Sequence, residues 1–150
     1  MYSNGGVEYS FYNNKGQLVK TIDPDGVINL YAYNDLGELE YSAVDLDQNG
    51  EISLSVDRVT RTVRDVTQAH GYDVVRTRTY VYPRDGDDEE VLVSTVETST
   101  DGLRQWRTTH GVTERTETSY PGSGLKIVTS YAADDSYVVS IYEYGRLVSV

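Results

Sequence analysis

Alternation of hydrophobic and polar positions is the dominant pattern along this chain. In residues 27–33, Ile28, Leu30 and Ala32 fall on one face of an extended backbone and the intervening residues on the other. That period of two is typical of a β-strand. Runs of this kind are separated by short segments rich in Asn, Asp, Gly and Pro, which favour turns. The pattern predicts an all-β chain with strands at about residues 7–12, 17–22, 27–33, 38–44, 72–82, 90–98, 103–109, 112–120, 125–132 and 137–143.

The opening part of the pattern recurs after 21 residues. A tyrosine, a glycine and a leucine keep this spacing, first as Tyr12, Gly16 and Leu18 and then as Tyr33, Gly37 and Leu39. A tight-turn sequence, Asp23-Pro24-Asp25-Gly26, lies between the two copies. The segment 142–147 repeats the pattern with a turn one residue shorter and keeps the glycine and leucine as Gly145 and Leu147. A fixed period in the twenties indicates a repeat architecture built from β-hairpins.

The stretch from residue 7 to 44 resembles the YD repeats of the Rhs family. That family's pattern is tyrosine, any residue, tyrosine, aspartate, two residues, glycine, any residue and leucine, and the chain matches it with Tyr31, Tyr33, Gly37 and Leu39. Asn34 replaces the usual aspartate and keeps the turn chemistry. The resemblance implies antiparallel hairpins that stack into an extended, twisted, solenoid-like or shell-like sheet. We expect residues 1–150 to form a single domain of this kind, a segment of a longer repeat protein.

The same resemblance implies a role. Shells of this family enclose a toxin domain or form surface-exposed bodies, in bacterial proteins that are secreted or held at the cell surface. The expected function is therefore that of a non-catalytic scaffold, with neighbouring repeats as partners. The alternative is a surface module that binds a glycan or a protein through tyrosines and Trp106 on one face of the sheet.

Residues 52–66 are ambiguous. Val56, Val59, Val63 and Val66 lie three and four residues apart, as on one face of a helix. Valine and threonine dominate the segment, however, and its neighbours have strand patterns. We predict a strand here.

The composition indicates a sheet with little hydrophobic core. The chain is 38% hydrophobic and this share includes 14 tyrosines, with only one Phe, one Trp and one Met. We therefore expect little buried core, and stability that depends on strand hydrogen bonds and cross-strand pairs. An open sheet also has two edges with unpaired backbone groups, so we expect self-association through those edges or continuation of the sheet in a parent protein.

Charge and residue usage exclude several classes of function. A net charge of −11 argues against nucleic acid and anionic membrane surfaces as partners. The absence of cysteine removes disulfides, thiolate metal sites and thiol nucleophiles. No apolar run approaches 18 residues, and residues 1–6 lack the basic and apolar regions of a signal peptide.

Residues 45–50 are the sharpest candidate site, because oxygen side chains at alternate positions before a glycine resemble a calcium-binding loop. The candidate ligands are the side chains of Asp45, Asp47 and Asn49 and the backbone carbonyl of Glu51. The twelfth position, where such loops carry a carboxylate, is Val56, and Asp57 reaches the ion only if the loop bulges. An acidic turn without metal is the competing interpretation.

No pattern points to an enzyme. His70 and His110 each precede a glycine, and we read both as solvated turn residues, because nothing places a hydroxyl beside either ring. The carboxylate runs 87–90 and 134–135 are adjacent residues, typical of solubilising loops rather than of a glycosidase pair. An Asp-Pro-any-Gly sequence also occurs at the self-cleaving site of Rhs proteins, but here Asp23–Gly26 lies near the start of the chain and inside the repeat. We interpret it as a turn.

Overall fold

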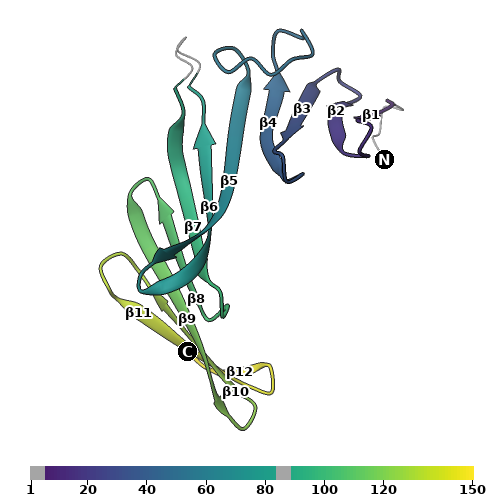
Figure 1. Ribbon diagram of the computed structural model, residues 1–150. Coiled ribbons are helices and arrows are strands. Elements are labelled where there is room, and N and C mark those ends of the chain that lie inside the picture. The colour runs from purple at the N-terminus through teal and green to yellow at the C-terminus, as the bar shows by residue number, and fades with distance from the viewer. Residues whose placement is uncertain (1–5, 84–88) are drawn as a thin grey trace. The chain divides into compact units, whose positions relative to one another are not determined.

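The protein is all-β, and its described residues form twelve antiparallel strands in one open sheet, ordered as they follow along the sequence (Figure 1). The computed structural model describes residues 6–83 and 89–150. The strands are β1 (Tyr9–Tyr12), β2 (Leu18–Ile22), β3 (Ile28–Tyr33), β4 (Leu39–Asp45), β5 (Arg58–Ala69), β6 (Tyr72–Val81), β7 (Val91–Ser99), β8 (Arg104–Thr109), β9 (Val112–Gly122), β10 (Leu125–Tyr131), β11 (Tyr137–Glu143) and β12 (Arg146–Ser149).

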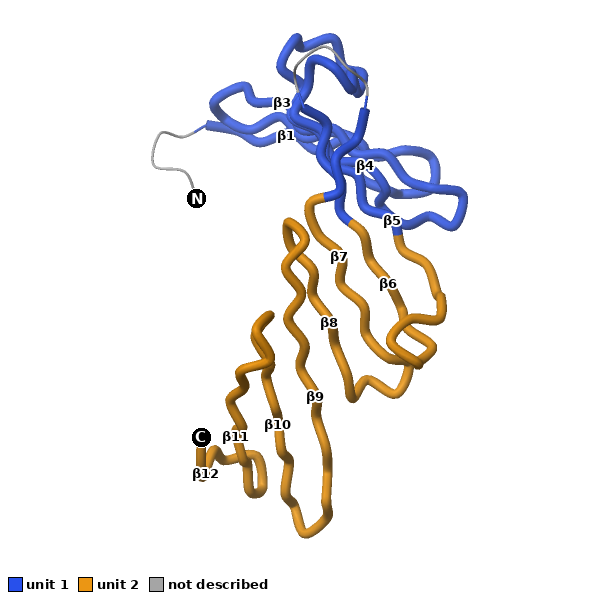
Figure 2. Tube along the Cα trace, turned by 90° about the vertical axis from the view of Figure 1, so that its left-hand side faces the viewer, with its two compact units in different colours: residues 1–63, 79–92 blue, residues 64–78, 93–150 orange. Residues whose placement is uncertain are grey.

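The chain divides into two compact units (Figure 2). Unit 1 comprises Met1–Val63 and Thr79–Leu92, and unit 2 comprises Arg64–Arg78 and Val93–Val150. The strands β5, β6 and β7 each contribute residues to both units.

The all-β prediction is confirmed, and most predicted strands lie within one or two residues of the observed ones. The predicted strand over 52–66 is wrong in its first half, because β5 begins only at Arg58 and runs to Ala69. Residues 53–57 instead form a turn, in which the carbonyl of Ser53 accepts the N–H groups of Val56 and Asp57 at 3.1 and 2.8 Å. β5 extends through Ala69 and β9 through Gly122, so the turn that follows each of these strands has only two residues.

Four hairpins turn within two residues, the second of which is always glycine. In each of them both residues have positive φ, as in His70 (55°) and Gly71 (80°). This is the type I′ geometry, whose twist matches that of the flanking strands. The four pairs are His70-Gly71, His110-Gly111, Ser123-Gly124 and Tyr144-Gly145.

The β1–β2 and β3–β4 hairpins share a longer turn that is the same in every hydrogen bond. The Asn13 side-chain oxygen accepts the N–H groups of Lys15 and Gln17, and its amide donates to the Gln17 side chain. Asn34 repeats all three bonds, 21 residues later, with residues 36 and 38. Gly16 and Gly37 lie at these bends with φ of 77° and 82°. Asp23 accepts the corresponding two N–H bonds in the β2–β3 turn, which closes at Gly26.

The three hairpins that carry the repeat pattern also share a β-bulge. Strand pairing shifts by one residue just after the turn, where Tyr12 pairs with Leu18, Tyr33 with Leu39, and Tyr142 with Leu147. In each case the residue that follows the leucine has no direct partner, because the next pair skips it. A bulge adds local right-handed twist to a strand pair, so the repeat in sequence is also a repeat in backbone geometry.

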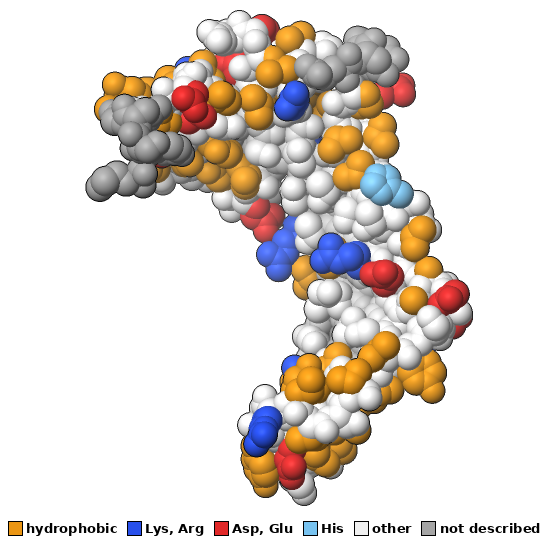
Figure 3. Space-filling view, turned by 180° about the vertical axis from the view of Figure 1, so that it is seen from behind, with side chains coloured by type: hydrophobic (Ala, Val, Ile, Leu, Met, Phe, Trp, Pro, Cys, Tyr) orange, Lys and Arg blue, Asp and Glu red, His pale blue; other side chains and the backbone are white. Residues whose placement is uncertain are grey.

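Few side chains are buried. In unit 1 the core consists of Leu30, Ala43, Val59 and Tyr82, with Ile28, Tyr41, Ile52 and Leu54 packed against it. In unit 2, Val74 and Trp106 are the buried hydrophobic side chains of the described residues. Most other hydrophobic side chains are partly or fully exposed, and Figure 3 shows them among polar side chains on the face seen there, with a group over the end of unit 2 that holds β10 to β12.

Candidate functional sites

The loop between β4 and β5 is organised by Asp57. This residue is fully buried, and its two carboxylate oxygens accept the backbone N–H groups of Leu46 and Ser53 at 2.8 and 2.9 Å. The turn at residues 53–57 delivers Asp57 to this position and leaves Val56 exposed. Val56 holds the twelfth position of the calcium-loop pattern, and the carboxylate that enters the loop is that of the next residue, Asp57.

Asp45, at the end of β4, is the second buried carboxylate of the loop, with 4% of its surface exposed. Its Oδ2 accepts the N–H of Gly50 at 3.0 Å. Its Oδ1 is also buried and has no hydrogen-bond partner. A buried carboxylate oxygen without a partner is unfavourable, since it has lost its water without replacement.

Three of the five predicted metal-ligating residues come together. One carboxylate oxygen each from Asp45, Asp47 and Asp57 lies within 4.8 Å of the other two. Asn49 contacts the group through its amide nitrogen, which donates to Asp47 at 2.9 Å, and its Oδ1 accepts the N–H of Glu51 at 2.7 Å. Glu51 is exposed.

His70 is more than a solvated turn residue. Its ring stacks on Trp106 with centroids 4.2 Å apart and planes 12° from parallel, and its Nε2 lies 2.8 Å from Oε2 of Glu97. Trp106 is consequently only 7% exposed. The partners of His70 are an indole and a carboxylate, so this cluster has the composition of a packed turn rather than of a nucleophile–base pair.

The other candidates remain separate from one another. His110 is exposed at its turn. Asp87 and Asp88 lie outside the described residues, and Glu90 pairs with Arg61 and accepts the Tyr82 hydroxyl. Asp134 accepts the N–H and the hydroxyl of Ser136, and these two bonds hold the pKa of its carboxyl below the usual range.

Cross-strand ion pairs occupy much of the remaining polar surface. Asp65 on β5 accepts from Arg76 and Arg78 on β6, at 2.6 and 3.2 Å, and the hydrogen bonds from Arg76 lower the pKa of Asp65. In unit 1, Arg61 joins Glu40 and Glu90 at 2.9 and 3.0 Å. Burial, together with the hydrogen bond to Glu90, raises the pKa of Tyr82. These groups stabilise the sheet and need no catalytic explanation.

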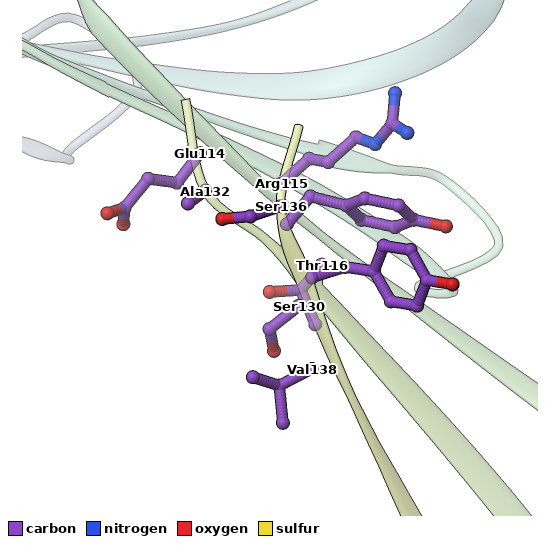
Figure 4. A pocket seen from close by; sticks show the side chains of 9 residues that line it. Glu114, Arg115, Thr116, Ser130, Ala132, Ser136 and Val138 are labelled. Carbon is purple, nitrogen blue, oxygen red and sulfur yellow. The ribbon is translucent and has the colours of Figure 1, made fainter. Parts of the chain in front are cut away.

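A shallow hollow of about 390 Å³ lies on β9, β10 and β11 in unit 2 (Figure 4). The guanidinium of Arg115 lies 3.9 Å from the ring centroid of Tyr131, which is 5.7 Å from that of Tyr137. Figure 4 shows hydroxyl groups of Thr116, Ser130 and Ser136 among the side chains that line it. The hollow combines aromatic faces, a cation, the carboxylate of Glu114 and hydroxyls.

Fold and sites together define an all-β protein with one open antiparallel sheet and two polar clusters. No protein-family model matches the chain. No curated protein matches it either. Among the described residues, no helix is long and apolar enough to cross a membrane.

Proposed function

We propose that the chain is a non-catalytic structural segment of a YD/Rhs-type shell, which encloses or presents a toxin or surface domain. One observation carries the proposal. The hairpins at Asn13 and Asn34 share the same turn, and the hairpins with Tyr12, Tyr33 and Tyr142 share the same bulge. A unit that repeats in sequence, hydrogen bonding and register is what a hairpin-stacking scaffold requires.

The scarcity of buried side chains supports the same role. A protein of this kind gains stability from each strand's bonds to its neighbours, and it needs no deep core. A shell also has to expose two large faces, one towards its content and one towards solvent. The exposed tyrosines, threonines and ion pairs on both units fit such a wet, two-faced sheet.

The partners in this proposal are further strands at the sheet edges. All four residues of β1 and all four of β12 are exposed. Edge strands of this kind pair readily with another chain or with a further repeat of their own. We propose neighbouring repeats of a longer bacterial secreted or surface protein as the natural partners, and a second copy of this chain as the substitute when it is studied alone.

The test of the shell is the coding sequence on either side of these 150 residues. Further copies of the 21-residue unit, followed by an unrelated C-terminal domain, are the expected result. Flanks without any such unit would overturn the proposal.

Sedimentation velocity tests the edges. The chain should sediment above its monomer mass of 16.8 kDa as concentration rises. Tyr9→Lys, which puts a charge on β1, should lower the sedimenting mass by blocking association through β1, because charges on an edge strand oppose edge pairing. Leu36→Lys, at an exposed turn tip, is the matched control and should leave the association unchanged. A strictly monomeric wild type would contradict edge pairing.

Glycan binding is the second candidate, and the hollow of Figure 4 is the feature that favours it. Trp106 is covered by His70 and is unsuited to stacking on a sugar. The candidate therefore rests on Tyr131 and on Tyr137, which is 64% exposed. Micromolar binding on a glycan array that Tyr137→Ala abolishes would support the module; an array without binding would leave only the scaffold.

A further inference from the structure

The β4–β5 loop buries negative charge without a matching cation. Asp45 and Asp57 are 4% and 0% exposed, and together with Asp47 they place three carboxylates within 4.8 Å of one another. None of the ion pairs among the described residues involves any of the three. The ammonium group of Lys20 lies near Gly50, but it forms no ion pair with them. Like charges at this distance repel, and burial strengthens the repulsion.

The orphan oxygen of Asp45 is an independent observation that points to a ligand. Backbone N–H groups occupy both oxygens of Asp57 and one oxygen of Asp45, while Oδ1 of Asp45 is buried without any hydrogen bond. Buried polar atoms almost always have a partner, so one without a partner requires an explanation. A cation bound by the three carboxylates, with Oδ1 as the ligand from Asp45, would supply both the missing partner and the missing positive charge.

We propose that Asp45, Asp47 and Asp57 bind Ca²⁺. The donor set contains only carboxylate oxygens and lacks His and Cys, which is the preference of a hard cation. Ca²⁺ accepts ligands at about 2.3–2.6 Å in irregular geometry, so oxygens on opposite sides of the ion lie about 5 Å apart. The three oxygens fit around one such ion, and water or backbone carbonyls complete its coordination.

The proposed ion has a structural role that does not depend on the shell. It ties the end of β4, through Asp45, to the residue that precedes β5, through Asp57. With three protein carboxylates, the affinity belongs with the weaker extracellular calcium modules, at a Kd of roughly 0.1–1 mM. Unit 1 should therefore be more stable in calcium, whether or not the chain is part of a shell.

The experiment is a calorimetric titration of the chelator-treated chain with CaCl₂, combined with thermal melts at 10 mM CaCl₂ and in NaCl of equal ionic strength. We expect one site and a rise in Tm of about 3 °C or more over NaCl. Asp47 is exposed, and Asp47→Asn keeps the oxygen that accepts the N–H of Asn49 but removes the negative charge and the second oxygen, which accepts the Asn49 amide. It should weaken binding at least tenfold and abolish the rise in Tm.

Two further variants make the result decisive. Asp45→Asn removes a buried charge but keeps an acceptor for Gly50, so it should abolish binding and leave the calcium-free Tm unchanged or higher. Asp134→Asn is the matched control in a turn of unit 2, and it should keep the full rise in Tm. No heat and no rise in the wild type would overturn the proposal. So would equal rises in Asp47→Asn and wild type, or an equal rise with Mg²⁺.

Discussion

Replacing Asn34 by alanine tests directly whether the turns stabilise this sheet. The side chain of Asn34 accepts the N–H groups of Leu36 and Glu38 at 3.0 and 2.9 Å and donates to the Glu38 carboxylate at 3.1 Å. Alanine removes all three bonds. Each is worth about 0.5–1.5 kcal/mol when buried and less here, because water reaches the turn. We expect Asn34→Ala to lower the free energy of unfolding of the β3–β4 hairpin by about 1–2 kcal/mol, as for a lost helix cap.

The assay is native-state hydrogen exchange of the amides of β3 and β4, because it reports the local opening of unit 1 separately from unit 2. Leu36→Ala is the matched control, since Leu36 lies in the same turn and is 85% exposed. Its amides should exchange as in the wild type, apart from the substituted residue.

Asn13→Ala provides the sharper comparison, because Asn13 accepts the same two backbone N–H bonds as Asn34 and donates its third bond to the Gln17 amide in place of the Glu38 carboxylate. If the two hairpins are copies of one structural unit, the two substitutions should cost equal free energies to within about 0.5 kcal/mol, the usual limit of additivity for separate sites. Asn34→Ala that behaves like Leu36→Ala would refute the reasoning. Unequal costs at the two asparagines would show that the copies differ energetically.

Three further outcomes follow from single contacts. Gly124→Ala should cost about 1–2 kcal/mol in urea denaturation, because φ is +74° and the new Cβ would lie 2.5 Å from the ring of Tyr144; Tyr144→Ala in the same chain should recover the steric part. Because the pKa of Tyr82 is raised in the folded protein, the stabilisation that its neutral hydroxyl gives to folding is complete below pH 10 and is lost as pH rises through the folded pKa. Tyr82→Phe should therefore reduce the loss of stability at alkaline pH in a pH–stability curve. Because the pKa of Asp65 is lowered in the folded protein, the stabilisation from its carboxylate is complete above the unfolded pKa and is lost as pH falls through the folded pKa. Arg76→Gln should raise the pKa of Asp65 in an NMR titration.

The strands could be predicted because their determinants are local. Gly37 and Gly145 mark bends with positive φ. Alternation in residues 27–33 placed Ile28, Leu30 and Ala32 on one face of a strand, and the structure adds that Leu30 is buried. The β-bulges could not be predicted from local sequence. The sequence Gly-any-Leu is visible, but the shift in pairing after Leu39 depends on the partner strand.

The sites were harder, because they depend on contacts between distant residues. The loop motif led to Asp45 and Asp47, but whether Asp57 enters the loop depends on the turn at residues 53–57. The stacking of His70 on Trp106 joins residues 36 positions apart, and no pattern in either neighbourhood reveals it. The sequence predicted that His70 and His110 lie in turns, but it did not predict that the His70 ring stacks on Trp106.

A sheet whose strands neighbour one another in sequence order has a consequence for both proposals. Each strand bonds only to the strands before and after it, so its stability is close to a sum of local terms. An ion bound at Asp57 therefore stabilises the strands next to the β4–β5 loop and not the far edge of the sheet. An added hairpin at β1 or β12 likewise needs only a matching edge and no rearrangement elsewhere. Nearest-neighbour bonding thus makes the chain extendable without a large core, and for the same reason it makes a locally bound ion valuable to unit 1 alone.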